Sequence, residues 1–146
     1  MRMIKISEEQ LEEIKRHAER EYPHECCGLL IGRIEDAGRT RVISETYPVI
    51  NSWEASPQHD RMLIAPIDYA RAEREAGKKG LGVVGDYHSH PDHPAVPSAF
   101  DLEHSPWTTM SYIVVSVLKG RAAGLRSWEN AEDHSKFNEE EIVKGS

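Results

Sequence analysis

The first clear pattern in the chain is an amphipathic helix near its beginning. Three apolar residues recur at helical spacing with charged residues between them: Leu11, Ile14 and Ala18. Ser7, followed three residues later by Gln10, makes a capping box that marks the start of this helix. The pattern predicts a helix that runs to about Glu21 and stops near Pro23.

Short apolar and β-branched runs elsewhere in the chain predict strands. Residues 28–32 and 40–47 are two such runs, and a turn-like segment at 35–38 lies between them, so they should form a hairpin. Further strands are expected at the remaining apolar runs: 81–88, 112–118 and 125–128. The strands are separated by polar and glycine-containing segments, and the chain shows no internal repeat.

Helices should occupy several of the segments between and after these strands. One is expected to begin at Pro66 and end between residues 77 and 80, a short one to cover 98–104, and a terminal one to cover 138–143. Residues 48–62 have little periodicity and are expected to form a long loop that contacts substrate. Because hairpins and helices mix without regular βαβ repeats, we expect an α+β fold in one domain over residues 1–146.

Composition narrows the class of protein. The 146 residues are 38% hydrophobic and 29% charged, which is typical of a globular protein, and no apolar run reaches the roughly 20 residues that span a bilayer. The beginning of the sequence lacks the apolar stretch of a secretory signal, so we expect a cytoplasmic location. A net charge of -7 repels phosphate backbones, so nucleic acid is not an expected partner, and the lack of a spanning apolar run means that a membrane is not expected either.

The stretch with the clearest chemistry lies after the predicted strand at 81–88. His88 and His90 are separated by one residue on an extended segment, so both imidazoles point to the same side and can reach one ion. Asp101 follows after ten intervening residues and could supply a third ligand, which would leave the open position of a catalytic zinc site. Chance also produces such histidine pairs, and Ser98 with Asp101 is equally a helix-capping pattern.

Glu25 is a second candidate, because it precedes the apolar run at 28–32 and a carboxylate there could accept and return a proton. From local sequence alone, however, Glu25 is more typical of a solvated loop. The adjacent Cys26 and Cys27 cannot easily bridge each other, so we expect them to be structural rather than a disulfide or a reactive pair.

Together these residues resemble the motif of the JAMM (MPN-plus) metallopeptidases. The motif pairs a glutamate before a Cys-Gly-Leu-type strand with His-Ser-His-Pro and Pro-Ser-x-x-Asp, which are met here by Glu25, residues 88–91 and residues 97–101. The resemblance implies a curved mixed β-sheet flanked by helices, similar in layout to cytidine deaminases. It also implies one Zn²⁺ per chain.

The resemblance further implies roles for the matching residues. His88, His90 and Asp101 would bind zinc, Glu25 would act as general acid and base, and Ser98 would donate a hydrogen bond to the oxyanion. The family cleaves peptide or isopeptide bonds after the C-terminal Gly-Gly of a ubiquitin-like protein. This chain looks most like small prokaryotic members that act on sulfur-carrier proteins, including cysteine-releasing peptidases, and such members often form homodimers.

Other interpretations stay open from sequence alone. A non-catalytic MPN scaffold would bind partners without cleaving them, although such relatives usually lose a ligand. A zinc deaminase would need His-x-Glu and a downstream Cys-x-x-Cys, and neither is present. Asp92 and His93 are expected to be solvated loop residues. Asp86 shares strand parity with the histidines and could orient one of them, but we leave it outside the predicted site.

Overall fold

The fold is built around a β-sheet that closes on itself. The computed structural model describes residues 2–52, 62–103, 110–131, 133 and 135–145. Within these ranges the strand order is β1-β3-β2-β4-β5-β6-β7, and β1 pairs with both β3 and β7, which closes a barrel. The strand bounds are β1 Met3–Ser7, β2 Cys27–Glu35, β3 Thr40–Val49, β4 Gly82–Pro91, β5 Ser111–Leu118, β6 Arg121–Asn130 and β7 Phe137–Gly145.

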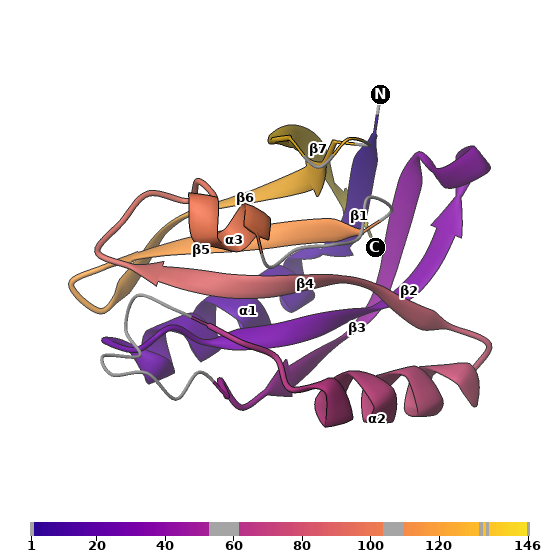
Figure 1. Ribbon diagram of the computed structural model, residues 1–146, viewed down its shortest axis with the longest axis horizontal. Helices are drawn as coiled ribbons and strands as arrows, with labels where there is room; N and C mark the ends of the chain where they lie inside the picture. Colours follow the sequence, from indigo (N-terminus) through magenta and orange to yellow (C-terminus); the bar gives the residue numbers. More distant parts are fainter. Residues whose placement is uncertain (1, 53–61, 104–109, 132, 134, 146) are drawn as a thin grey trace.

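The sheet is mixed, and helices flank it (Figure 1). β1 pairs in parallel with β3 and β7, β4 pairs in parallel with β5, and the other neighbours are antiparallel. The helices are α1 Glu8–Glu21, α2 Pro66–Gly77 and α3 Ala99–Glu103, with a short 3₁₀ turn η1 at Asp36–Gly38. The predicted α+β class, the hairpin of β2 and β3, and the flanked mixed sheet are confirmed.

The amphipathic pattern of α1 is confirmed in detail. The Ser7 hydroxyl accepts a hydrogen bond from the Gln10 N–H at 3.1 Å, and the Gln10 side chain accepts one from the Ser7 N–H at 3.0 Å. Leu11 and Ile14 are buried against the sheet. Full burial of an aliphatic side chain of this size stabilises the fold by roughly 1.5 to 3 kcal/mol.

A bulge on β4 decides which face of the sheet carries the histidine pair. Val83 belongs to the core under α2, whereas Tyr87 belongs to the core under α1, although both positions are odd. The pairing of β2 with β4 skips Val84, so the alternation of side chains changes sides there. Beyond the bulge, Tyr87 points toward α1. His88 and His90 occupy the alternate positions of the strand, so they point away from α1.

The end of the chain contradicts one prediction. Residues 138–143 were expected to form a helix, but they lie within β7, which pairs with β6 and β1. The glutamates favour a helix locally, but pairing with a strand on each side overrides that preference. Glu140 accepts a hydrogen bond from the Ser127 hydroxyl at 2.7 Å and lies 3.4 Å from Nη1 of Arg41, which is itself fully buried.

Several boundaries also differ from the predictions. β1 was missed, and β4 continues through the histidines to Pro91 instead of ending at His88. β3 extends to Val49, which shortens the expected loop, and residues 53–61 of that loop lie outside the described residues, as does residue 104 of the predicted short helix. None of the helices in the described ranges has the length and apolar character needed to cross a bilayer.

Candidate active site

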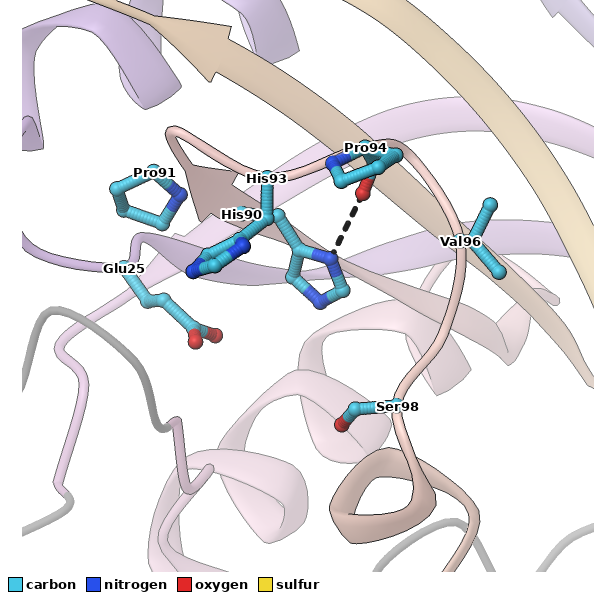
Figure 2. A pocket seen from close by; sticks show the side chains of 7 residues that line it. All are labelled: Glu25, His90, Pro91, His93, Pro94, Val96 and Ser98. Atoms are coloured by element: carbon cyan, nitrogen blue, oxygen red, sulfur yellow. Dashed lines mark hydrogen bonds between the residues drawn. The ribbon is translucent and has the colours of Figure 1, made fainter.

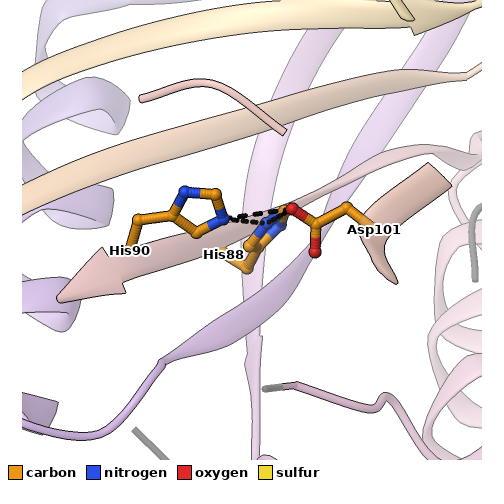
Figure 3. A group of neighbouring side chains, drawn as sticks. All are labelled: His88, His90 and Asp101. Atoms are coloured by element: carbon orange, nitrogen blue, oxygen red, sulfur yellow. Dashed lines mark hydrogen bonds and ion pairs between the residues drawn. The ribbon is translucent and has the colours of Figure 1, made fainter. Parts of the chain in front are cut away.

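Three predicted ligands meet at one point. His88 and His90 extend from β4, and Asp101 extends from α3 across from them (Figure 3). Asp101 Oδ2 lies 3.1 Å from Nε2 of each histidine, and the two Nε2 atoms are 3.2 Å apart. All three side chains are buried, and among the described residues they form the group suited to holding a metal ion.

The donor set fits zinc. Nδ1 of His90 lies 3.0 Å from the carbonyl oxygen of Pro94, and a carbonyl only accepts, so Nδ1 carries the proton and the Nε2 lone pair is left for a ligand bond. Zinc binds imidazole nitrogen and carboxylate oxygen at about 2.0 to 2.2 Å in a tetrahedron, which separates its ligand atoms by roughly 3.3 Å. The separations between His88, His90 and Asp101 match that value.

The charges at this point favour a cation. Burial opposes protonation of His88, but the charge and hydrogen bond of Asp101, together with the charges of Glu25 and Asp86, outweigh burial and raise the pKa of the imidazole to about 9. Burial would raise the pKa of the Asp101 carboxyl, yet the charge of His88 and hydrogen bonds from both histidines hold it well below its usual range. A positive charge placed where these three side chains converge is therefore stabilised.

Asp101 is held in place by the start of α3. The Ser98 N–H donates to Asp101 Oδ2 at 2.8 Å, and the Asp101 N–H donates to the Ser98 hydroxyl at 3.1 Å. This is the capping arrangement expected from the sequence. Because the Ser98 oxygen accepts in this bond, its own hydroxyl proton remains available for a ligand.

A cavity of about 330 Å³ opens beside the ligand group. It is lined by Glu25, His90, Pro91, His93, Pro94, Val96 and Ser98. In Figure 2 the side chains of Glu25, His90 and Ser98 face the same space. Glu25 is only 5% exposed, so it is not the solvated loop residue that its local sequence alone suggested.

Glu25 reaches this cavity because β2 pairs with β4. Cys27 lies opposite His88 in the sheet, which brings the residues just before β2 alongside the histidine pair. The Cys26 N–H donates to the Ser89 hydroxyl at 2.8 Å, and the Ser89 N–H donates to the Cys26 carbonyl at 3.2 Å. All five predicted site residues are thus brought to one place in the fold.

Neighbouring residues that the prediction left aside now have positions. Asp92 and His93 are exposed, as expected, but His93 also lines the cavity, and Asp92 accepts a hydrogen bond from the Tyr22 hydroxyl at 2.6 Å. Asp86 is buried, and burial raises the pKa of its carboxyl to about 7. Cys26 is buried too, and burial raises the pKa of its thiol to about 12, which agrees with a structural role.

Comparison with known protein families identifies the family of this chain. A model described as prokaryotic homologs of the JAB domain matches residues 7–131. The chain belongs to this family. The predicted JAMM and MPN resemblance is thereby confirmed, and the histidine pair, Asp101 and Glu25 of this JAB-domain protein all lie within the matched range.

Two curated relatives are similar to this JAB-domain protein. A desampylase of Haloferax volcanii is 31% identical over 101 residues, which cover 64% of this chain and 63% of the relative. A probable TtuB-protein conjugate cleaving protease of Thermus thermophilus is 34% identical over 97 residues, which cover 66% of this chain and 60% of the relative. The match thus spans about three fifths of each relative's length.

Solved structures agree with the fold. The solution structure of a Desulfitobacterium hafniense protein is 30% identical and superposes with a TM-score of 0.84, covering 99% of this chain and 94% of that one. The crystal structure of a JAB1/MPN domain protein from Archaeoglobus fulgidus is 21% identical with a TM-score of 0.55, covering 99% of this chain and 100% of that one. This JAB-domain protein therefore has the JAB1/MPN fold.

Proposed function

We propose that this chain is a zinc-dependent peptidase that hydrolyses the bond after the C-terminal Gly-Gly of a ubiquitin-like or sulfur-carrier protein. The observation that carries the proposal is the convergence of three buried ligand atoms beside a cavity that Glu25 and Ser98 also face. His88, His90 and Asp101 would hold one zinc ion per chain and leave its fourth position open.

When bound, a zinc ion would supply Lewis acidity, which lowers the pKa of a water molecule to near neutral and polarises a substrate carbonyl. Glu25 accepts the proton that the attacking water loses, because its carboxylate lies beside the cavity. The water oxygen bonds to the carbonyl carbon, and the Ser98 hydroxyl donates to the oxyanion that forms. The oxyanion then collapses to re-form a carbonyl, and the carbon–nitrogen bond breaks. Glu25 passes its proton to the leaving amine and returns to its carboxylate form.

The relatives support the class of substrate. The Haloferax volcanii relative is named a desampylase, and the Thermus thermophilus relative is named for cleaving conjugates of TtuB with protein. Both names describe removal of one protein from another. We accordingly propose that the substrate of this chain is a protein conjugate or fusion whose scissile bond follows an extended, small-residue tail, since the cavity beside Glu25 is small at about 330 Å³.

The rival proposal is a JAB-domain scaffold that binds partners without cleaving them. Keeping every ligand and the facing carboxylate argues against this rival, because a scaffold needs none of them. Metal content separates the two proposals first. We expect about one zinc per chain in the purified protein by elemental analysis, little in His88→Ala, and an unchanged amount in His93→Gln, a control that alters a neighbouring histidine outside the ligand group.

Activity then tests the proton carrier. The substrate is a ubiquitin-like protein extended beyond its Gly-Gly by a fluorescent amide, assayed with zinc and with a chelator. Glu25→Gln is expected to keep its zinc and lose turnover, whereas Asp101→Ala is expected to lose both. Full turnover in Glu25→Gln would remove the proposed base, and a wild-type protein that never retains zinc would favour the scaffold.

A further inference from the structure

The backbone beside Glu25 is held in an unusual way. The peptide group that joins Glu25 to Cys26 lies just before β2, outside its ladder of backbone hydrogen bonds. Its N–H, on Cys26, donates to the Ser89 hydroxyl at 2.8 Å. Its carbonyl, on Glu25, accepts from the Asn51 side-chain amide at 3.2 Å. Two side chains therefore fix both polar atoms of one peptide group, where sheet partners would ordinarily do so.

This arrangement fixes the direction in which the Glu25 side chain leaves the backbone. A peptide group is planar, so holding its N–H and its carbonyl sets the orientation of the whole plane. The Cα of Glu25 belongs to that plane, and its side chain starts there. Ser89 lies between the two histidines on β4. The bond to Ser89 therefore fixes the position of the Glu25 backbone relative to the proposed metal ligands.

Asn51 is itself anchored on its other side. Its side-chain oxygen accepts from the Leu63 N–H at 3.0 Å, and the neighbouring Ser52 N–H donates to the Leu63 carbonyl at 2.8 Å. The amide therefore bridges a backbone donor and a backbone acceptor, which fixes which end is oxygen and which is nitrogen, because a flip would set two donors and two acceptors against each other. Asn51 thus links the backbone of Leu63 to the backbone of Glu25.

We infer that Asn51 is a positioning residue for Glu25, an inference that rests on the proposed function. It contacts the backbone of Glu25 rather than the reacting atoms, and it sets where the carboxylate stands relative to the ligands on β4. Displacement of a reacting group by about 1 Å can slow an enzyme on the order of 100-fold. Loss of Asn51 should therefore lower turnover while leaving the metal ligands intact.

The first experiment measures turnover and zinc content with the amide substrate described above. Asn51→Ala is expected to lower kcat about 10- to 100-fold at saturating zinc, with KM within about threefold and zinc per chain unchanged. Gln10→Ala is the matched control, because that side-chain amide also bridges two backbone groups, the Ser7 N–H at 3.0 Å and the Ser44 carbonyl at 2.8 Å. Gln10 lies in the first turn of α1, at the opposite end of the helix from Glu25. Gln10→Ala should lose stability but keep kcat.

A second variant covers the case in which Asn51→Ala does not fold. Asn51→Asp keeps an oxygen that accepts from the Leu63 N–H but cannot donate to the Glu25 carbonyl. It therefore removes the donor to Glu25 while keeping the acceptor for Leu63, and it is expected to show the same loss of kcat. A higher KM with unchanged kcat in either variant would mean that Asn51 contacts substrate instead, and would overturn the inference.

A double-mutant cycle with Glu25→Gln gives the deciding result. The cycle compares residual turnover, measured with Glu25→Gln at high enzyme concentration. If Asn51 acts through Glu25, then Asn51→Ala should not lower that residual turnover further. If the two losses multiply, Asn51 acts independently and the inference is wrong. The outcomes also separate it from the proposed function: an inactive wild-type protein refutes the peptidase, whereas an active wild type with an equally active Asn51→Ala refutes only the role of Asn51.

Discussion

Replacing Ser98 by alanine tests whether its hydroxyl serves catalysis or only the start of α3. The hydroxyl accepts from the Asp101 N–H at 3.1 Å, and alanine removes that bond. The loss of an N-cap of this kind costs about 1 kcal/mol of stability. The second bond, from the Ser98 N–H to Asp101 Oδ2 at 2.8 Å, uses the backbone of Ser98 and not its side chain, so it survives the substitution. Asp101 should therefore keep its place as a ligand.

The catalytic role predicts a much larger effect on turnover than on metal binding. One oxyanion donor is worth about 3 to 4 kcal/mol, which corresponds to a fall in kcat of roughly 10² to 10³. Zinc affinity of Ser98→Ala should fall by less than about tenfold, because the ligand group is unchanged. The two quantities are measured separately, kcat at saturating zinc with the amide substrate and zinc affinity by competition with a coloured chelator.

The comparison with threonine completes this test, because Ser98→Thr keeps a hydroxyl that can both accept and donate. It should retain most of the wild-type kcat and the cap. If Ser98→Ala keeps kcat within about threefold of wild type at saturating zinc while its zinc affinity falls steeply, the hydroxyl serves only to hold Asp101. That result would refute the oxyanion role.

Two further predictions concern stability. Burial lowers the pKa of His17, whose ring bonds to the Tyr87 hydroxyl at 2.7 Å, so folding favours its neutral form; its contribution is complete above about pH 6.5 and is lost as pH falls. Urea unfolding should show a smaller loss of stability from about pH 7 to pH 5 in His17→Phe than in wild type, and equal losses would count against this. Arg41→Met should lower the free energy of unfolding by about 3 to 5 kcal/mol, because it leaves the buried Glu140 without its cation. Adding Glu140→Leu should recover most of that loss, and no recovery in urea unfolding would show that the pair is not coupled.

Local sequence was sufficient where the determining contacts are themselves local. The start of α1 was predicted because Ser7 and Gln10 satisfy each other's backbone within one turn. The histidine pair was predicted because strand side chains alternate. The helix expected at 138–143 was wrong because its glutamate-rich run carries no sign of the distant strand β1 with which it pairs, or of Arg41, which lies 99 positions from Glu140.

The site shows the same division. The role of Glu25 could be proposed only from the family motif, since its contact with the histidine strand depends on the pairing of β2 with β4. Asn51 was missed altogether, and residue types could not have revealed it. It contacts backbone groups of Glu25 and Leu63, and a backbone group is the same whatever residue carries it. Only the folded geometry identifies such a contact.

The way in which the barrel closes has a consequence for how the chain folds. β1 and β7 pair in parallel with Met3 opposite Glu141, a separation of 141 − 3 = 138 positions that holds along the whole pair. Contacts between such distant segments form late, because the chain must lose the entropy of closing the intervening loop first. On a ribosome, β1 therefore lacks one of its two neighbouring strands until residues 137–145 have emerged. The barrel cannot close before β7 has been made.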